Sequence, residues 1–296
     1  MIAEAPSLVV TFVRHLSNTR YVRTADGVDL AYRVVGDGPV DLFWSFNQLN
    51  DVEAIAEHPP ILEFFDRLAG FTRVIVHDRR GMGRSSGDRG DLETDVADVL
   101  SLLDGVAAPR PYLASAVAGG AICVALAAKH PDRVAGVVWH GAFAQSIQTP
   151  SYPWGGTGEE LEDRATETEA GWGTEPFAER FVANGAPSMA GNSETNRFYA
   201  SWMRRTGSAQ AAAAYNRAWD SIDLHPLLPT VKVPVLVLNR GGDADEGAYV
   251  ASLLPGGRFL NLEGEDFIPY YDSGAIVAAI REFVEETSRS RDSRAS

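Results

Sequence analysis

The sequence predicts an α/β protein whose mostly parallel sheet is covered by helices on both faces and interrupted by an inserted helical cap. Runs rich in Val, Ile and Leu alternate with helix-like segments, a pattern typical of a parallel sheet buried on both faces. The alternation stops between Gly141 and Leu224 and then resumes, which indicates an insertion rather than a second domain. Hydrophobic residues make up 45% of the 296 residues, enough to bury a large core.

The chain opens with an extension and a hairpin. Residues 1–18 form the extension, in which Ser7–Leu16 is expected to pack on the body as a short helix or strand. Thr19–Ala25 and Val28–Val35 are strand-like and are joined at Asp26-Gly27, a pair that suits a tight turn with positive φ.

Strands and helices alternate through the rest of the core, which we assign to residues 19–141 and 225–287. The further predicted strands are Val40–Phe46, Arg73–Asp78, Tyr112–Val117, Val134–His140, Val233–Arg240 and Arg258–Leu262. The predicted helices are Leu92–Val106, Ala118–His130, Ala244–Leu254 and Ser273–Glu286.

Two segments fall outside this pattern. Residues 142–224 carry no strand signal and are rich in Trp, Tyr, Phe, Glu and Gly, so they are predicted to form the helical cap. Residues 288–296 are polar and are expected to form a disordered tail.

Charge and cysteine content exclude several classes of protein. The formal net charge is −14, which argues against nucleic acid or an anionic membrane as the main partner. The single cysteine, Cys123, leaves no internal disulfide and no cysteine-rich metal site. The longest apolar stretch, Leu113–Ala128, is too short and too rich in Gly and Ala to span a membrane, and the N-terminus is a poor secretory signal. We therefore expect a cytoplasmic protein, either a monomer or a homodimer.

Three segments resemble motifs of the α/β-hydrolase fold. His77–Ser85 reads HDRRGMGRS, Gly119–Val134 reads GGAICVALAAKHPDRV, and Val233–Asp243 reads VPVLVLNRGGD. The resemblance is to the subgroup whose domains also occur fused to bacterial nucleotide cyclases. It implies an eight-stranded sheet, a cap, and a catalytic serine, histidine and acid at fixed positions.

Two of these three positions carry residues that cannot play the family's roles. The serine of this family stands on a strained strand-to-helix turn, G-x-S-x-G, and aligning the paired glycines places Val117 at the nucleophile position. The histidine pattern G-x-x-H-x-P corresponds to GEDFIP at residues 264–269, which places Phe267 at the histidine position. Asp243 matches the acid. Ordinary acyl-serine hydrolysis is therefore not expected.

Backbone donors survive such side-chain replacements. The resemblance implies an oxyanion hole formed by the N–H groups of Ala118 and of the Phe46–Asn47 region. A helix N-terminus lies nearby, and its dipole favours negative charge. The sequence thus predicts stabilisation of an enolate, a phenolate or another oxyanion.

Candidate replacement groups lie at the carboxyl edge of the sheet, where ligands of such folds bind. His140 ends a predicted strand there and is a candidate general base, together with Asp243. Aromatic cap residues over an apolar turn suit a large, flat, hydrophobic ligand. The expected pocket residues are Ser45, Gln48, Trp154, Trp172, Trp202 and Tyr270.

These expectations favour an enzyme that does not hydrolyse its substrate. We expect cofactor-free carbon–carbon bond formation or cyclisation on an aromatic or polyketide-type substrate, in natural product biosynthesis, with no metal. Two alternatives stay open. One is a hydrolase with a relocated triad of Ser115, His140 and Asp243, and the other is a ligand-binding protein without catalysis.

Overall fold

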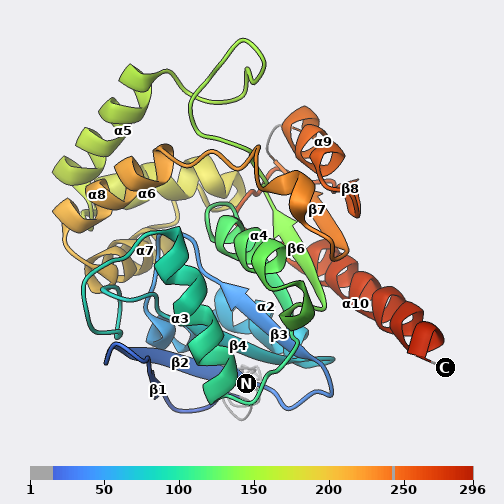
Figure 1. Cartoon of the computed structure of the whole chain (residues 1–296). Coiled ribbons are helices and arrows are strands. Elements are labelled where there is room, and N and C mark those ends of the chain that lie inside the picture. The colour runs from blue at the N-terminus through green and yellow to red at the C-terminus, as the bar shows by residue number, and fades with distance from the viewer. Residues whose placement is uncertain (1–15, 242–243, 296) are drawn as a thin grey trace, which may run out of the picture.

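The computed structural model describes residues 16–241 and 244–295. An eight-stranded sheet with the order β1-β2-β4-β3-β5-β6-β7-β8 forms its centre (Figure 1). β1 and β2 pair antiparallel to their neighbours, and all later pairs are parallel. The strands are β1 Arg20–Arg23, β2 Asp29–Val35, β3 Asp41–Ser45, β4 Arg73–His77, β5 Tyr112–Ala116, β6 Gly136–His140, β7 Val235–Asn239 and β8 Gly257–Asn261.

Helices cover both faces of the sheet, and strand residues alternate between the two core clusters. Trp44 of β3 belongs to the cluster that includes side chains of α2 and α10, whereas the preceding Phe43 belongs to the cluster that includes side chains of α3, α4 and α9. The bounds are α2 Pro59–Ala69, α3 Leu92–Gly105, α4 Gly119–Lys129, α9 Ala244–Leu253 and α10 Gly274–Ala295. Short 3₁₀ segments occupy Val52–Ala56, Pro131–Arg133, Pro187–Met189 and Leu228–Thr230.

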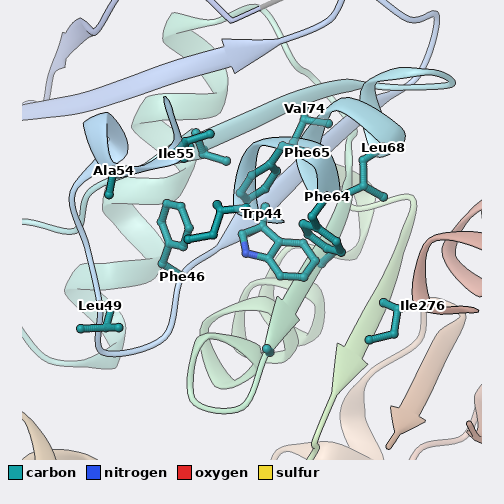
Figure 2. Packing of buried hydrophobic residues seen from close by; sticks show 14 of the residues in the cluster. Trp44, Phe46, Leu49, Ala54, Ile55, Phe64, Phe65, Leu68, Val74 and Ile276 are labelled. Carbon is teal, nitrogen blue, oxygen red and sulfur yellow. The ribbon is translucent and has the colours of Figure 1, made fainter. Parts of the chain in front are cut away.

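The core beneath α2 is aromatic and supports the loop that follows β3. Trp44 packs edge-on against Phe64 and Phe65, with ring centroids 4.9 and 5.9 Å apart. Figure 2 shows Phe46 beside these rings and Leu49 apart from them, farther along the loop that follows β3. Burying such a side chain stabilises the fold by roughly 1.5–3 kcal/mol, so the cluster anchors this loop firmly.

Four helices form the cap, and the sequence dictates where each begins. Thr157, Thr174, Asn192 and Ser208 precede them, and each side chain accepts a hydrogen bond from a backbone N–H of the first turn. Side chains of α6 and α7 join the core cluster of α2, so this half of the cap is packed onto the sheet. The cap helices are α5 Gly158–Gly171, α6 Glu175–Gly185, α7 Ser193–Thr206 and α8 Ala209–Asp220.

The predicted fold class is confirmed, with two differences in detail. The helix α2 was not among the predicted elements. The expectation of a disordered tail is wrong for residues 288–295, because α10 continues to Ala295. The Tyr112 hydroxyl lies 2.8 Å from Thr287 Oγ1 and 2.9 Å from Ser288 Oγ, which ties this helix to the sheet.

Two further expectations concern the extension and membrane spans. Of the segment Ser7–Leu16, only Leu16 falls among the described residues, where it bridges to Val35. No helix in the described ranges has the length and apolar character needed to cross a membrane.

Candidate active site

The site is built on the strand-to-helix turn between β5 and α4. Val117 occupies the tip of this turn with φ +51°, a left-handed conformation that is unusual for a β-branched residue. Its N–H donates to the His140 carbonyl at 2.8 Å, and its carbonyl accepts the Trp139 indole N–H at 2.7 Å. These two bonds hold the turn in a geometry that its side chain disfavours.

Paired glycines let the helix approach the sheet closely enough to form this turn. A Cβ on Gly119 would lie 2.3 Å from Ser115 Oγ, and one on Gly120 would lie 2.0 Å from Trp139 Nε1. The Ala118 N–H, at the N-terminus of α4, has no acceptor among the described residues. The turn thus presents a free backbone donor next to a side chain that has no nucleophilic atom.

Ser115 and His140 do not form a triad. In the register of β5 and β6, Ser115 pairs with Trp139 and Ala116 pairs with His140. Adjacent strand residues point to opposite faces, so the Ser115 and His140 side chains lie on opposite sides of the sheet. Ser115 Oγ is buried and donates to the Ser45 carbonyl at 3.0 Å. The relocated triad is therefore wrong, because Ser115 does not face His140. Asp243, its third member, lies outside the described residues.

His140 is buried behind Phe267. Their ring centroids are 5.1 Å apart, and neither imidazole nitrogen has a hydrogen-bond partner in the described part of the chain. Burial, and secondarily the nearby Arg240 charge, lowers the pKa of His140 to about 3. Gly141, with φ +64°, leaves room for this arrangement, since a Cβ there would lie 2.3 Å from Phe267 Cζ. His140 is thus a neutral imidazole whose two ring nitrogens have no hydrogen-bond partner among the described residues.

Two connected cavities flank Val117. The first, which we name the aromatic chamber, has a volume of about 350 Å³ and is bounded mainly by apolar side chains. The second, the polar chamber, has a volume of about 550 Å³ and lies beneath α5 and α8. Both are lined by Asn47, Gln48, Val117, Phe181 and Asn184, so the two chambers meet at the turn.

Most of the predicted pocket residues line these chambers. Ser45, Phe46, Trp202, Phe267 and Tyr270 line the aromatic chamber. Gln48 lines both chambers, and Trp154 lines the polar one.

One predicted pocket residue has another role, and two residues were missed. Trp172 lines neither chamber, because its indole N–H donates to the Met203 carbonyl at 2.8 Å and holds the cap together. In the sequence, Arg79 belongs to the motif His77–Ser85, which indicated only the fold, and Tyr215 was not among the predicted pocket residues. Only their contacts in three dimensions connect them with the site.

The described residues contain no group of three His, Cys, Asp or Glu side chains arranged to hold a metal ion. The groups available at the turn are backbone donors, His140 and the polar side chains of the two chambers.

Comparisons with known proteins place this geometry in a family. Residues 59–255, about two thirds of the chain, match the family model described as alpha/beta hydrolase fold. A bifunctional esterase/perhydrolase of Acinetobacter calcoaceticus is 28% identical over 262 residues, covering 82% of this chain and 91% of that protein. A putative carbamate hydrolase of Variovorax paradoxus is 41% identical over 76 residues, which are 25% of this chain and only 29% of that protein.

Solved structures agree on the fold. The enol-lactonase of Burkholderia xenovorans has a TM-score of 0.73 and 24% identity, covering 90% of this chain and 100% of that one. An esterase of Exiguobacterium antarcticum has a TM-score of 0.77 and 17% identity over 90% of this chain and all of that one.

These relatives correct the expected reaction. The expectation of carbon–carbon bond formation or cyclisation on a polyketide-type substrate is wrong, because the relatives are named as esterases and hydrolases. The Val117 side chain has no nucleophilic atom, but this does not identify the reaction. On its sequence match and its fold, the chain belongs to the α/β-hydrolase family.

Proposed function

We propose that this protein hydrolyses a carboxylic ester or lactone by direct attack of water on a carbonyl held above Val117. The observation that carries the proposal is the turn itself. It keeps its left-handed backbone, and with it the free Ala118 N–H, beside a side chain that cannot attack. Removing one preorganised oxyanion-hole donor from an enzyme typically costs about 2.7–4 kcal/mol of transition-state stabilisation.

In this proposal Val117 replaces the family's serine and Phe267 replaces its histidine, so no acyl-enzyme forms. The water oxygen adds to the carbonyl carbon while a base accepts one water proton. The tetrahedral oxyanion is stabilised by the Ala118 N–H and by an N–H of the loop that contains Asn47. Collapse of this intermediate breaks the bond to the leaving oxygen, which takes up a proton.

His140 is the base that we propose for this step. It is neutral, and Ala116 and Phe267, which flank it, line the aromatic chamber. Rotation of Phe267 about its side-chain torsions would open His140 to water in that chamber. Hydration removes the cause of its low pKa, so the exposed imidazole becomes a stronger base than the buried one.

The two chambers suggest which substrates fit. An apolar or aromatic acyl part suits the aromatic chamber, where Phe46, Trp202 and Tyr270 offer ring faces and edges. The leaving part would then occupy the polar chamber beneath α5 and α8. We therefore propose a small hydrophobic ester as the substrate class.

The test is a panel of p-nitrophenyl and aryl-acyl esters. We expect turnover without a burst of product, no labelling by a fluorophosphonate, and loss of turnover in His140→Gln. Ser115→Ala is the matched control and should retain wild-type activity. Fluorophosphonate labelling, a burst, or inactivation by Ser115→Ala would contradict direct attack by water.

Ligand binding without turnover is a second candidate function. The observation that favours it is that Phe267 covers the imidazole nearest to the turn. It predicts that esters and their amide analogues bind equally well in calorimetry and that no variant at Phe267 or His140 gives hydrolysis. Turnover that depends on His140 would exclude it.

A further inference from the structure

The loop after β3 is held in place by hydrogen bonds to the Asn47 carbonyl. The Asn47 carbonyl accepts a hydrogen bond from Asn50 Nδ2 at 3.0 Å and a second, short one from Arg79 Nη2. The Arg79 backbone N–H in turn donates to Asn50 Oδ1 at 3.1 Å. The loop is therefore clamped at two points to the segment that follows β4.

The direction of that carbonyl sets the direction of a donor. A peptide unit is planar, and in its trans form the C=O and N–H point in opposite directions. Holding the Asn47 carbonyl on Arg79 therefore turns the Gln48 N–H away from Arg79. Gln48 lines both chambers, and a cation on the carbonyl also polarises the peptide and strengthens its N–H as a donor.

Arg79 also touches the cap. Its Nη2 donates to the Tyr215 hydroxyl at 3.0 Å, and its Cζ lies 4.8 Å from the centroid of that ring. Tyr215 stacks on Trp219 with centroids 5.8 Å apart, and both rings line the polar chamber. Tyr215 also shares a small apolar cluster with Ala118, the residue that supplies the other oxyanion donor.

A purely structural ion pair would look different, as the next residue shows. Arg80 makes charge-assisted hydrogen bonds to both Asp26 and Asp98, at 2.6–3.2 Å. Arg79 is only 3% exposed, yet its nearest paired carboxylate oxygen, on Asp95, is 4.0 Å away. In the described part of the chain, its Nε and Nη1 have no hydrogen-bond partners. The side-chain hydrogen bonds of this buried guanidinium thus go to a neutral carbonyl and a phenol rather than to a carboxylate.

We propose that Arg79 is a positioning residue that fixes the loop containing Asn47 and Gln48 relative to Ala118 and couples this loop to the polar chamber through Tyr215. This role rests on the proposed function only where it is measured by ester turnover. Its other readout is the preference of the site for a tetrahedral anion over a neutral ligand. A residue that only supported the fold would affect both kinds of ligand alike.

The experiment compares Arg79→Lys and Tyr215→Phe with Arg80→Lys as the matched control. The probes are a benzyl phosphonate monoester anion and the neutral benzamide of the same outline, and calorimetry gives both dissociation constants. We expect Arg79→Lys to weaken phosphonate binding by about 10²-fold, the cost of a displaced catalytic group, and amide binding by less than about twofold. Tyr215→Phe should weaken the phosphonate by a smaller factor, and Arg80→Lys should change neither.

The two proposals fail separately. Equal weakening of both probes, or wild-type protein that does not prefer the phosphonate, would overturn the positioning role. Selective loss of phosphonate binding without ester turnover in any form of the protein would leave the positioning role standing and remove the hydrolysis. If Arg79→Lys does not fold, as judged by its thermal transition, Tyr215→Phe becomes the deciding variant. Unchanged phosphonate affinity in Tyr215→Phe would then overturn the proposal.

Discussion

The turn at Val117 and the loop after β8 border the same cavity in opposite ways. The turn contributes backbone, because its left-handed conformation and the free Ala118 N–H are present beside a valine side chain. The loop contributes a side chain, because Phe267 fills the space above Gly141 and covers His140. A backbone donor does not need a particular side chain beside it, whereas a general base does, and in the proposed function that base is His140.

Gly120→Ala should break the turn, with the largest expected effect. The added Cβ would lie 2.0 Å from Trp139 Nε1, the atom that holds the Val117 carbonyl. We expect a loss of about 3 kcal/mol in the free energy of unfolding, measured by urea denaturation.

Gly158→Ala is its control, because a Cβ there meets nothing within 4 Å, and it should change stability by less than about 0.5 kcal/mol. Equal stability of the two variants would show that the close approach at Gly120 is not required.

Acid should destabilise the protein through His140. Its pKa in the folded state is about 3, against about 6.5 in the unfolded chain. The unfolded state therefore binds the proton first, and stability falls by about 1.4 kcal/mol per pH unit as the pH drops below 6.5 toward 3. At pH 5 this loss amounts to about 2 kcal/mol.

His140→Met should remove this part of the loss. Urea denaturation at pH 5 and pH 8 gives the change in the free energy of unfolding for the wild-type protein and for His140→Met. The difference between these two changes is the contribution of His140. His58 and His77 also have lowered pKa values from burial, so some acid sensitivity should persist in the variant. An unchanged pH dependence would mean that His140 is not a buried neutral imidazole.

Phe267→Ala should sharpen the comparison by opening the loop side of the cavity. With water admitted to His140, we expect ester hydrolysis to rise about tenfold, equivalent to about 1.4 kcal/mol of activation free energy. The rate should follow a single ionisation near the ordinary histidine value of about 6.5.

Two further variants control this prediction. Phe267→Leu keeps an apolar cover and should retain the wild-type rate, and adding His140→Gln to Phe267→Ala should abolish the gain. A gain that persists without His140 would point to a wider entrance rather than to a base.

Much of the fold was predictable because local patterns encode it. Runs of Val, Ile and Leu predicted the parallel strands, and the loss of strand signal after Gly141 predicted the cap. The position of His140 at a strand end followed from the same pattern. The face to which Ser115 points did not, since it depends on the register of β5 against β6.

The missed parts of the site depend on contacts between distant residues. Arg79 meets Asn47 across 32 positions and Tyr215 across 136, and no local pattern reports such pairs. The prediction of a disordered tail was wrong because polar composition does not reveal contacts between distant residues. Here Tyr112 contacts Thr287 and Ser288. The likeness to domains fused to nucleotide cyclases stays a prediction.

Val117→Gly should change stability least, and it tests the turn by relieving the strain of its backbone rather than by adding a clash. Glycine adopts φ +51° without steric cost, whereas a β-branched residue in the left-handed region costs about 1–2 kcal/mol. Part of that gain is offset by the greater chain entropy of glycine when unfolded, so we expect a net stabilisation of about 0.5–1 kcal/mol. Ala118→Gly, one residue on at φ −59°, should gain nothing. A destabilised Val117→Gly would mean that the packing of the valine side chain in the two chambers outweighs the strain of its backbone.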